Sequence, residues 1–274
     1  MRIFADYHTH TVHSHGRGTI LENVLAARRQ GLRQVGIADH APGSWSWIGV
    51  RNAGEYDEIR REIELVNSYY PDIEVLCGAE CNVMTVDGQL DLAMSDLKRL
   101  DIVLCGLHPT IVPPTWSDAW NLVGTNWLAR YSSRATRRAR TINTKALISA
   151  VEHYPIDIIT HPGYKFSIDT AELARACARR GTSLELNASH HQLSVDFVEV
   201  AAAQGVTFVL GSDAHRPNGV GQVGRAVAIA ERAGLDHRAI LNAEDDGEHR
   251  RPVWRKRPMA RELYAVREKA RTGR

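Results

Sequence analysis

The chain contains 274 residues, of which 43% are hydrophobic and 24% are charged, and its formal net charge is +2. This composition argues against a disordered or fibrous chain, and the length suits one large α/β barrel. The nearly balanced charge does not indicate a nucleic-acid partner, although arginines concentrate in residues 129–145 and 249–274. We interpret these arginine runs as solvated helix faces, with nucleic-acid binding as the alternative.

The predicted strands and helices alternate along the chain. Short runs rich in β-branched residues are typical of strands, and the longer periodic segments between them are typical of helices. Thr19 and Glu22 form a capping pattern at the start of the first helix. The predicted strands are 2–7, 34–39, 73–80, 101–107, 156–160, 183–187 and 207–211, and the predicted helices are 19–30, 52–69, 118–151, 169–180, 194–204 and 221–233.

Repeated strand–helix units predict parallel pairing, because parallel strands need a crossover connection. Seven such strands favour a closed α/β barrel over an open sheet. No G-x-G-x-x-G motif follows the first strand, which argues against a dinucleotide-binding sheet, and the chain has no P-loop or G-x-S-x-G elbow. We expect residues 1–235 to form the barrel domain and residues 236–274 to form a basic C-terminal helical extension, packed on the barrel or trailing from it.

The four cysteines lie within apolar stretches, which predicts buried free thiols in a reducing compartment. They are Cys77, Cys81, Cys105 and Cys177. No apolar run is long enough to span a membrane, and the first residues lack the apolar core of a secretory signal. We therefore expect a cytoplasmic protein without a membrane partner.

Metal-binding residue types follow six of the seven predicted strands, and the strand at 183–187 offers only Asn187. In a parallel barrel the carboxyl ends of the strands meet on one face, where active sites form. The residues at these ends are His8, His10, Asp39, His40, Glu80, His108, His161, Asp213 and His215. Burying so many imidazoles and carboxylates costs several kcal/mol for each uncompensated charge, a cost that bound metal ions remove.

The spacing of these residues also predicts chelation. His8 and His10 share one face of an extended strand, as Asp213 and His215 do if the extended conformation continues. Mixed imidazole and carboxylate ligands favour zinc, manganese or iron over calcium. The remaining histidines have a simpler interpretation. His13, His153, His237 and His249 are expected to be solvated or to support loops, and His190 and His191 to be structural or on the substrate side.

The ordered motifs of the chain resemble those of the PHP (polymerase and histidinol phosphatase) family, especially its stand-alone YcdX-like and histidinol-phosphatase-like phosphoesterases. The matching pieces are "DYHTHTVHSHG", "GIADHAPG", "GAECNV", "GLHP", "ITHPG" and "GSDAHRP", which occur in this order between residues 6 and 217. The resemblance implies a distorted (β/α)7 barrel with a metal site at the C-terminal end of its strands.

The resemblance further implies a centre of three divalent metal ions, which would be zinc, manganese or iron. Within the loop after the first strand, His13 is the alternative to His15, and the "SHG" motif favours His15. The implied ligands are His8, His10, Glu80 and Asp213 for the first ion, Glu80, His108 and His161 for the second, and His15, His40 and His215 for the third, with Glu80 bridging the first two.

The implied reaction is metal-assisted hydrolysis of a phosphate monoester. A hydroxide that bridges two ions would attack phosphorus in line, and no covalent protein nucleophile is needed. Glu80, Asp213 and His215 are the residues assigned to catalysis. Arg17, Lys165 and Arg216 follow expected ligands by one to four residues and are the candidate substrate-binding cations.

Two neighbouring features have two interpretations each. Asp39 is either a partner that fixes the tautomer of an imidazole or a cap at the end of a strand. The loops after the second and fourth predicted strands contain Trp45, Trp47, Trp116 and Trp120, which would either stack on a substrate ring or pack the loops against the barrel rim.

The leading functional hypothesis is a phosphatase that acts on a small molecule such as histidinol phosphate or a nucleotide. One alternative is a PHP-type nuclease acting on DNA ends, which only the basic segments support. A metal-dependent amidohydrolase is a further enzyme class, but its bridging lysine has no clear counterpart here. The non-enzymatic alternative is a metal-binding protein, and the complete set of expected ligands argues against it.

Overall fold

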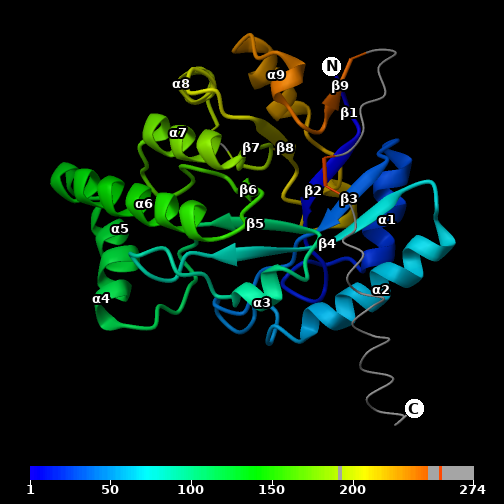
Figure 1. Cartoon of the computed structure of the whole chain (residues 1–274), viewed down its shortest axis with the longest axis horizontal. Helices are drawn as coiled ribbons and strands as arrows, with labels where there is room; N and C mark the ends of the chain where they lie inside the picture. The colour runs from blue at the N-terminus through cyan, green and yellow to red at the C-terminus, as the bar shows by residue number, and fades with distance from the viewer. Residues whose placement is uncertain (191–192, 246–252, 255–274) are drawn as a thin grey trace.

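The computed structural model describes residues 1–190, 193–245 and 253–254, and its strands are surrounded by helices (Figure 1). Seven parallel strands pair in sequence order, β2-β3-β4-β5-β6-β7-β8. They form a nearly closed barrel, so the predicted α/β barrel with seven strands is confirmed. His191, His249 and the expected helix near the C-terminus lie outside the described residues.

The strands and the main helices occur in the order predicted from the sequence. The barrel strands are β2 (Ala5–Thr9), β3 (Gln34–Ile37), β4 (Glu74–Asn82), β5 (Ile102–Gly106), β6 (Ile158–Ile159), β7 (Ser183–Asn187) and β8 (Phe208–Gly211). The helices that follow these strands include α1 (Ile20–Arg29), α2 (Glu55–Tyr69), α7 (Thr170–Arg180), α8 (Val195–Ala202) and α9 (Gly224–Arg232). A short helix that the sequence did not predict, α3 (Met94–Leu97), precedes β5. The capping box of Thr19 and Glu22 is present at the start of α1.

The first predicted strand is two strands with different partners. β1 (Arg2–Ile3) pairs antiparallel with β9 (Ala243–Glu244), whereas β2 belongs to the barrel. The change of partner occurs at Phe4, whose N–H donates to the Asn242 carbonyl at 3.1 Å. Residues 243–244 therefore pair directly with the start of the chain, as Figure 1 shows for β1 and β9.

The long helix predicted over 118–151 is not continuous. The chain forms α4 (Trp116–Asp118), a π-helical stretch η1 (Ala119–Gly124) and α5 (Thr125–Leu128) before α6 (Ser133–His153) begins. Ser132 has an extended backbone, and its side chain accepts a hydrogen bond from Ala135 N–H. Ser132 is therefore the N-cap of a new helix. Its side chain pairs the N–H of Ala135, which in a continuous helix would donate to a backbone carbonyl of the preceding turn.

The barrel closes between its first and last strands just beyond β8. His10 N–H donates to the Ala214 carbonyl at 2.8 Å, and Ala214 N–H donates to the His8 carbonyl at 3.2 Å. These two bonds place the chain that follows β8 beside the end of β2. Asp213 and His215, which flank Ala214, are thereby brought next to His8 and His10.

The opposite end of the barrel interior is apolar. Phe4, Tyr7, Leu76, Leu104 and Trp254 belong to one buried cluster there, and a larger cluster packs between the strands and the surrounding helices. The ring centroids of Tyr7 and Trp254 are 4.9 Å apart. No helix among the described residues has both the length and the apolar content to cross a membrane.

Candidate metal centre

The residues expected to bind metal converge at the carboxyl end of the barrel. His8 lies in β2 and Glu80 in β4, and the others follow the ends of β2, β3, β5, β6 and β8. His15 is exposed and His215 half-buried, whereas the rest of the set is buried. The nine residues brought together are His8, His10, His15, His40, Glu80, His108, His161, Asp213 and His215.

Glu80 lies between two groups of imidazoles. Its Oε1 is 3.1 Å from His108 Nε2 and 3.0 Å from His161 Nε2. Its Oε2 is 3.0 Å from His40 Nδ1 and 3.3 Å from His8 Nε2. Each oxygen of the carboxylate therefore faces a different pair of imidazoles, and one ligand atom each of His40, Glu80 and His108 lie within 4.8 Å of one another.

Asp213 has a comparable position on the other side of the site. Its Oδ1 is 3.3 Å from His10 Nε2 and 3.5 Å from His8 Nε2, and its Oδ2 is 3.0 Å from His190 Nε2. Asp213 adopts a φ of 53° and His161 a φ of 29°. Non-glycine residues rarely occupy this left-handed region, and such strain is concentrated at functional sites.

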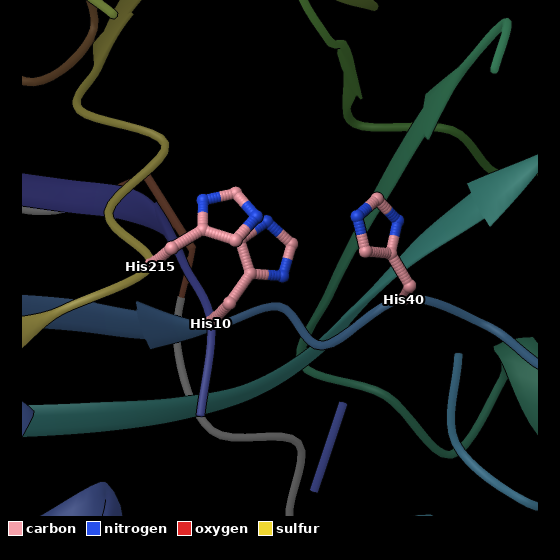
Figure 2. Close-up of side chains that lie close together, drawn as sticks. All are labelled: His10, His40 and His215. Carbon is pink, nitrogen blue, oxygen red and sulfur yellow. The ribbon is translucent and has the colours of Figure 1, made fainter. Parts of the chain in front are cut away.

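Three imidazoles from separate parts of the chain face one another in Figure 2. His10 and His215 lie against each other, with ring centroids 4.3 Å apart, and His40 approaches from the other side. The centroids of His10 and His40 are 4.6 Å apart. The ring of His15 adjoins the same group, 4.3 Å from that of His215 and 5.0 Å from that of His40.

The donor set fits divalent metal ions. Buried polar atoms are nearly always paired, yet several here have no hydrogen-bond partner among the described residues. They are His8 Nε2, both ring nitrogens of His10, His40 Nδ1 and Glu80 Oε2. Ligand atoms within 4.8 Å of one another occur in four groups: His10, His40 and His215; His8, His10 and Asp213; His40, Glu80 and His108; and His161, His190 and Asp213.

The electrostatics of the site keep its carboxylates ionised and divide its imidazoles. Burial alone would lower the pKa of His8 and of His161, but the adjacent carboxylates raise both, Glu185 foremost at His8 and Glu80 at His161. Burial alone would raise the pKa of Glu80, but the surrounding imidazoles, His8 foremost, hold that pKa well below its usual range. Burial lowers the pKa of His40 well below its ordinary value, and burial together with His10 lowers the pKa of His215 to about 4. A neutral imidazole and an ionised carboxylate are the forms that bind metals.

The loop between β2 and α1 places His13 and His15 on different sides. His13 faces α2, with Nδ1 3.4 Å from Glu55 Oε1 and Nε2 3.2 Å from Glu62 Oε2. His15 faces the metal-site residues instead. Asp39 accepts hydrogen bonds from Thr11 and Ser14 of this loop, so within the described residues it anchors the loop and is not bonded to an imidazole.

Three polar residues that contact the expected ligands were not assigned to the site from sequence. Glu185 in β7 lies 2.7 Å from His8 Nδ1, and Asn82 Oδ1 lies 2.7 Å from His108 Nδ1. His190, interpreted as structural or on the substrate side, contacts Asp213. The buried acidic residue within the apolar strand "SLELN" was the available signal for Glu185.

The three candidate substrate cations have different surroundings. Arg17 and Arg216 are exposed, and Arg216 borders an open pocket of about 350 Å³ that His190, Asp213 and His215 also line. Lys165 Nζ lies 4.5 Å from the centroid of the Tyr164 ring. That ring stacks on His190 at 3.6 Å, so Lys165 reaches the edge of the site through an aromatic pair.

The four tryptophans lie in the segments that follow β3 and β5, Trp45 and Trp47 in a loop, Trp116 in α4 and Trp120 in η1. Trp45 N–H donates to the Thr110 carbonyl at 2.8 Å, which joins the loops after β3 and β5. Trp45 and Trp47 are 5.1 Å apart between ring centroids, and Trp47 and Trp116 are 68% and 93% exposed. The loops are thus paired through their backbones, and these rings remain open to solvent.

A nearly closed barrel of seven parallel strands with a histidine-rich site at their carboxyl ends defines the class of this protein. The family model described as PHP domain matches residues 6–189, and the chain belongs to that family, so the resemblance noted from its motifs is confirmed. A probable phosphatase of Caldanaerobacter subterraneus subsp. tengcongensis is 32% identical over 256 residues, which cover 90% of this chain and 89% of the relative. A probable phosphatase of Shewanella sediminis is 30% identical over 258 residues, covering 88% and 90%.

Solved structures share the fold at low sequence identity. The histidinol phosphate phosphatase of Lactococcus lactis subsp. lactis, crystallised with zinc, L-histidinol and phosphate, aligns with a TM-score of 0.62 at 17% identity, covering 85% of this chain and 94% of that one. A putative histidinol phosphatase of Listeria monocytogenes aligns with a TM-score of 0.58 at 14% identity, covering 80% and 97%.

Proposed function

We propose that this PHP-family hydrolase cleaves a small phosphate monoester, such as histidinol phosphate or a nucleotide, at a centre of three divalent ions. The observation that supports this most directly is the position of Glu80, whose two oxygens face separate groups of imidazoles. The proposed ligands are His8, His10, Glu80 and Asp213 for one ion, Glu80, His108 and His161 for a second, and His15, His40 and His215 for a third.

Divalent ions at such a site would neutralise phosphate oxygens and activate a water molecule near neutral pH. Zinc, manganese and iron suit the mixed imidazole and carboxylate donors. The chain's own residues would provide orientation. Glu80 and Asp213 keep the imidazoles in place through the contacts described above, and His215 borders the pocket where the phosphate would enter.

We propose that Arg17, Lys165 and Arg216 bind the substrate's anionic groups. Arg216 supports this proposal best, because it lines the same pocket as Asp213 and His215. Arg17 is linked to the site through its backbone N–H, which donates to the His215 carbonyl at 2.9 Å. A guanidinium group suits phosphate because it offers paired donors in a planar fork.

The four buried free thiols further support the proposal of a reducing, cytoplasmic location.

Metal analysis of the purified protein, followed by assays with p-nitrophenyl phosphate and its bis-ester, tests this function. We expect at least two tightly bound ions and turnover of the monoester with added manganese or zinc. In Glu80→Ala the turnover should fall by about 100-fold or more, because loss of a bridging ligand removes several kcal/mol of stabilisation. Glu199→Ala, which truncates an exposed glutamate on α8, is the matched control.

The substrate class requires a second comparison. Histidinol phosphate, nucleoside monophosphates and single-stranded DNA should be assayed side by side at equal metal concentration. Faster turnover of the small monoesters than of DNA is expected. Preference for DNA would replace the phosphatase with a nuclease, and the absence of turnover with any metal and any of these substrates would refute the proposed function.

A further inference from the structure

Glu185 is a buried carboxylate in β7 that contacts expected ligands of two different ions. It is 1% exposed. Its Oε1 lies 2.7 Å from His8 Nδ1, and its Oε2 accepts a hydrogen bond from His161 N–H at 2.7 Å. Oε2 also accepts from Asn187 Nδ2 at 3.0 Å. One side chain therefore joins the ends of β2, β6 and β7.

The contact with His8 determines how that imidazole is presented. When His8 acts as a neutral metal ligand, an Nδ1 proton donated to Glu185 Oε1 leaves Nε2 as its free nitrogen. The other ring nitrogen, Nε2, then directs its lone pair toward Glu80 Oε2 at 3.3 Å and Asp213 Oδ1 at 3.5 Å. Carboxylates that hold the outer nitrogen of a metal-binding histidine in this way fix both its tautomer and its orientation.

The contact with His161 acts on the backbone. His161 has a φ of 29°, a conformation that needs support from its surroundings. The bond from its N–H to Glu185 gives that support and turns the imidazole toward Glu80, where Nε2 lies 3.0 Å from Oε1. His8 and His161 belong to the two groups of imidazoles on either side of Glu80, so Glu185 is connected to both groups.

Gly211 provides the space that Glu185 occupies. Gly211 in β8 is the register partner of Asn187, and a Cβ atom at position 211 would overlap Glu185 Oε1 and lie 2.9 Å from Cδ. Gly211 does not have a positive φ, so its backbone suits alanine. A single methyl group there would displace the Glu185 carboxylate without removing it. The two positions consequently offer independent ways to disturb the same contacts.

We propose that Glu185 is a positioning residue that couples the two groups of ligands on either side of Glu80, so that the affinities for two ions depend on it together. This inference rests on the metal centre proposed above. The competing interpretation is a carboxylate that only stabilises the fold, in which case metal affinity would survive its replacement once the protein is folded.

The test measures zinc and manganese affinity and stoichiometry by competition with a chromophoric chelator, using folded, metal-stripped proteins. Glu185→Gln keeps the shape of the side chain but replaces one acceptor oxygen with a donor. Gly211→Ala moves the carboxylate. We expect each variant to bind at least two ions about 10- to 100-fold more weakly than the unmodified protein. The double variant should be no weaker than the weaker single variant, because both changes break the same contacts.

Two controls separate positioning from loss of stability. Gly224→Ala adds a methyl group where nothing lies within 4 Å and should leave affinity unchanged. Trp254→Ala lowers stability at the opposite end of the barrel and should also retain affinity. If Glu185→Gln does not fold, the comparison of Gly211→Ala with Gly224→Ala decides the question by the same measurement.

The outcomes are distinct. Affinities within threefold of the unmodified protein in a folded Glu185→Gln variant, or a loss confined to one ion, would overturn the coupling proposed for Glu185. Fewer than two ions bound by the unmodified protein would instead contradict the proposed metal centre itself.

Discussion

Asp39 and Thr11 join the ends of two neighbouring barrel strands through a pair of hydrogen bonds. Asp39 Oδ1 accepts from Thr11 N–H at 2.7 Å, and Oδ2 accepts from the Thr11 hydroxyl at 2.6 Å. Ser14 Oγ donates to Oδ1 as well. Asp39 and Thr11 are fully buried, so solvent cannot replace the carboxylate as the acceptor for Thr11. The loop they belong to contains His15, whose ring reaches His40 and His215.

Asp39→Ala should therefore weaken both the fold and the site. We expect the free energy of unfolding to fall by about 2 to 3 kcal/mol, because a buried N–H and two hydroxyls lose a charged acceptor. Phosphatase activity should fall at the same time, since the loop would no longer hold His15 in place. Denaturant unfolding and monoester turnover measure the two effects. Ser14→Ala, which removes one of the three bonds, should have a clearly smaller effect, and equal losses would contradict this account.

Removal of metal ions should destabilise the protein. Ions that bind only the folded chain stabilise it by about 2.7 kcal/mol for each site at 100 times its dissociation constant. Chelation should therefore lower the melting temperature of the purified protein, and added zinc or manganese should restore it. Thermal unfolding with and without chelator checks this expectation. Chelation should lower the melting temperature of the Glu80→Ala variant much less. An equal fall in that variant would count against Glu80 as a ligand shared by two ions.

The four cysteines should not react in the native protein. All four are buried and free, and burial raises the pKa of both Cys77 and Cys177 to about 12. Because these folded pKa values exceed the ordinary value of 9.0, the thiols stay neutral at pH 8, and their contribution to stability declines only as the pH rises from about 9 towards 12. A thiol-reactive dye should label none of the four in the folded protein and all four in guanidinium chloride. Rapid labelling of the folded chain would show that the barrel opens readily.

Trp254→Ala should reduce stability without affecting the reaction. Trp254 is 9% exposed, packs edge-on against Tyr7 and accepts a hydrogen bond from Gln34 through its carbonyl at 2.8 Å. Loss of a buried tryptophan side chain costs about 3 to 5 kcal/mol, and this one closes the end of the barrel opposite the site. Unfolding measurements should show the loss, while kcat/KM at 25 °C stays within twofold. A large fall in kcat/KM would indicate that the two ends of the barrel are coupled.

Residues 236–274 were expected to form an extension, and the described part of this range contacts both the barrel and β1. Asn242 Nδ2, for example, donates to the carbonyls of Ala5 and Leu210 at 2.8 Å. β9 pairs with β1, and Trp254 joins the interior cluster with Phe4 and Tyr7. The boundary at residue 235 and the helical character of the remaining tail stay predictions. The structure adds that this range supplies contacts to the first residues of the chain.

The sequence by itself determined the order of the barrel strands and which residues lie at their carboxyl ends. Apolar runs and the residues that follow them are local features of the sequence. Because the parallel strands of a barrel all end on one face, His8, Glu80, His108 and His161 were predictable as neighbours. The capping box of Thr19 and Glu22 is equally local and was also predicted from sequence.

Only the tertiary structure decided which strands pair at the start of the chain and how the barrel strands are aligned relative to one another. The local sequence does not show that residues 2–3 and 5–9 form two strands. Both segments are extended, and they differ only in the strands with which they pair. Glu185 and His8 are 177 positions apart, and their contact arises because both strands place a side chain at the same depth of the barrel while Gly211 leaves room for the carboxylate. Sequence patterns indicate burial and strand direction, whereas the distance between two buried polar atoms depends on how all seven strands align.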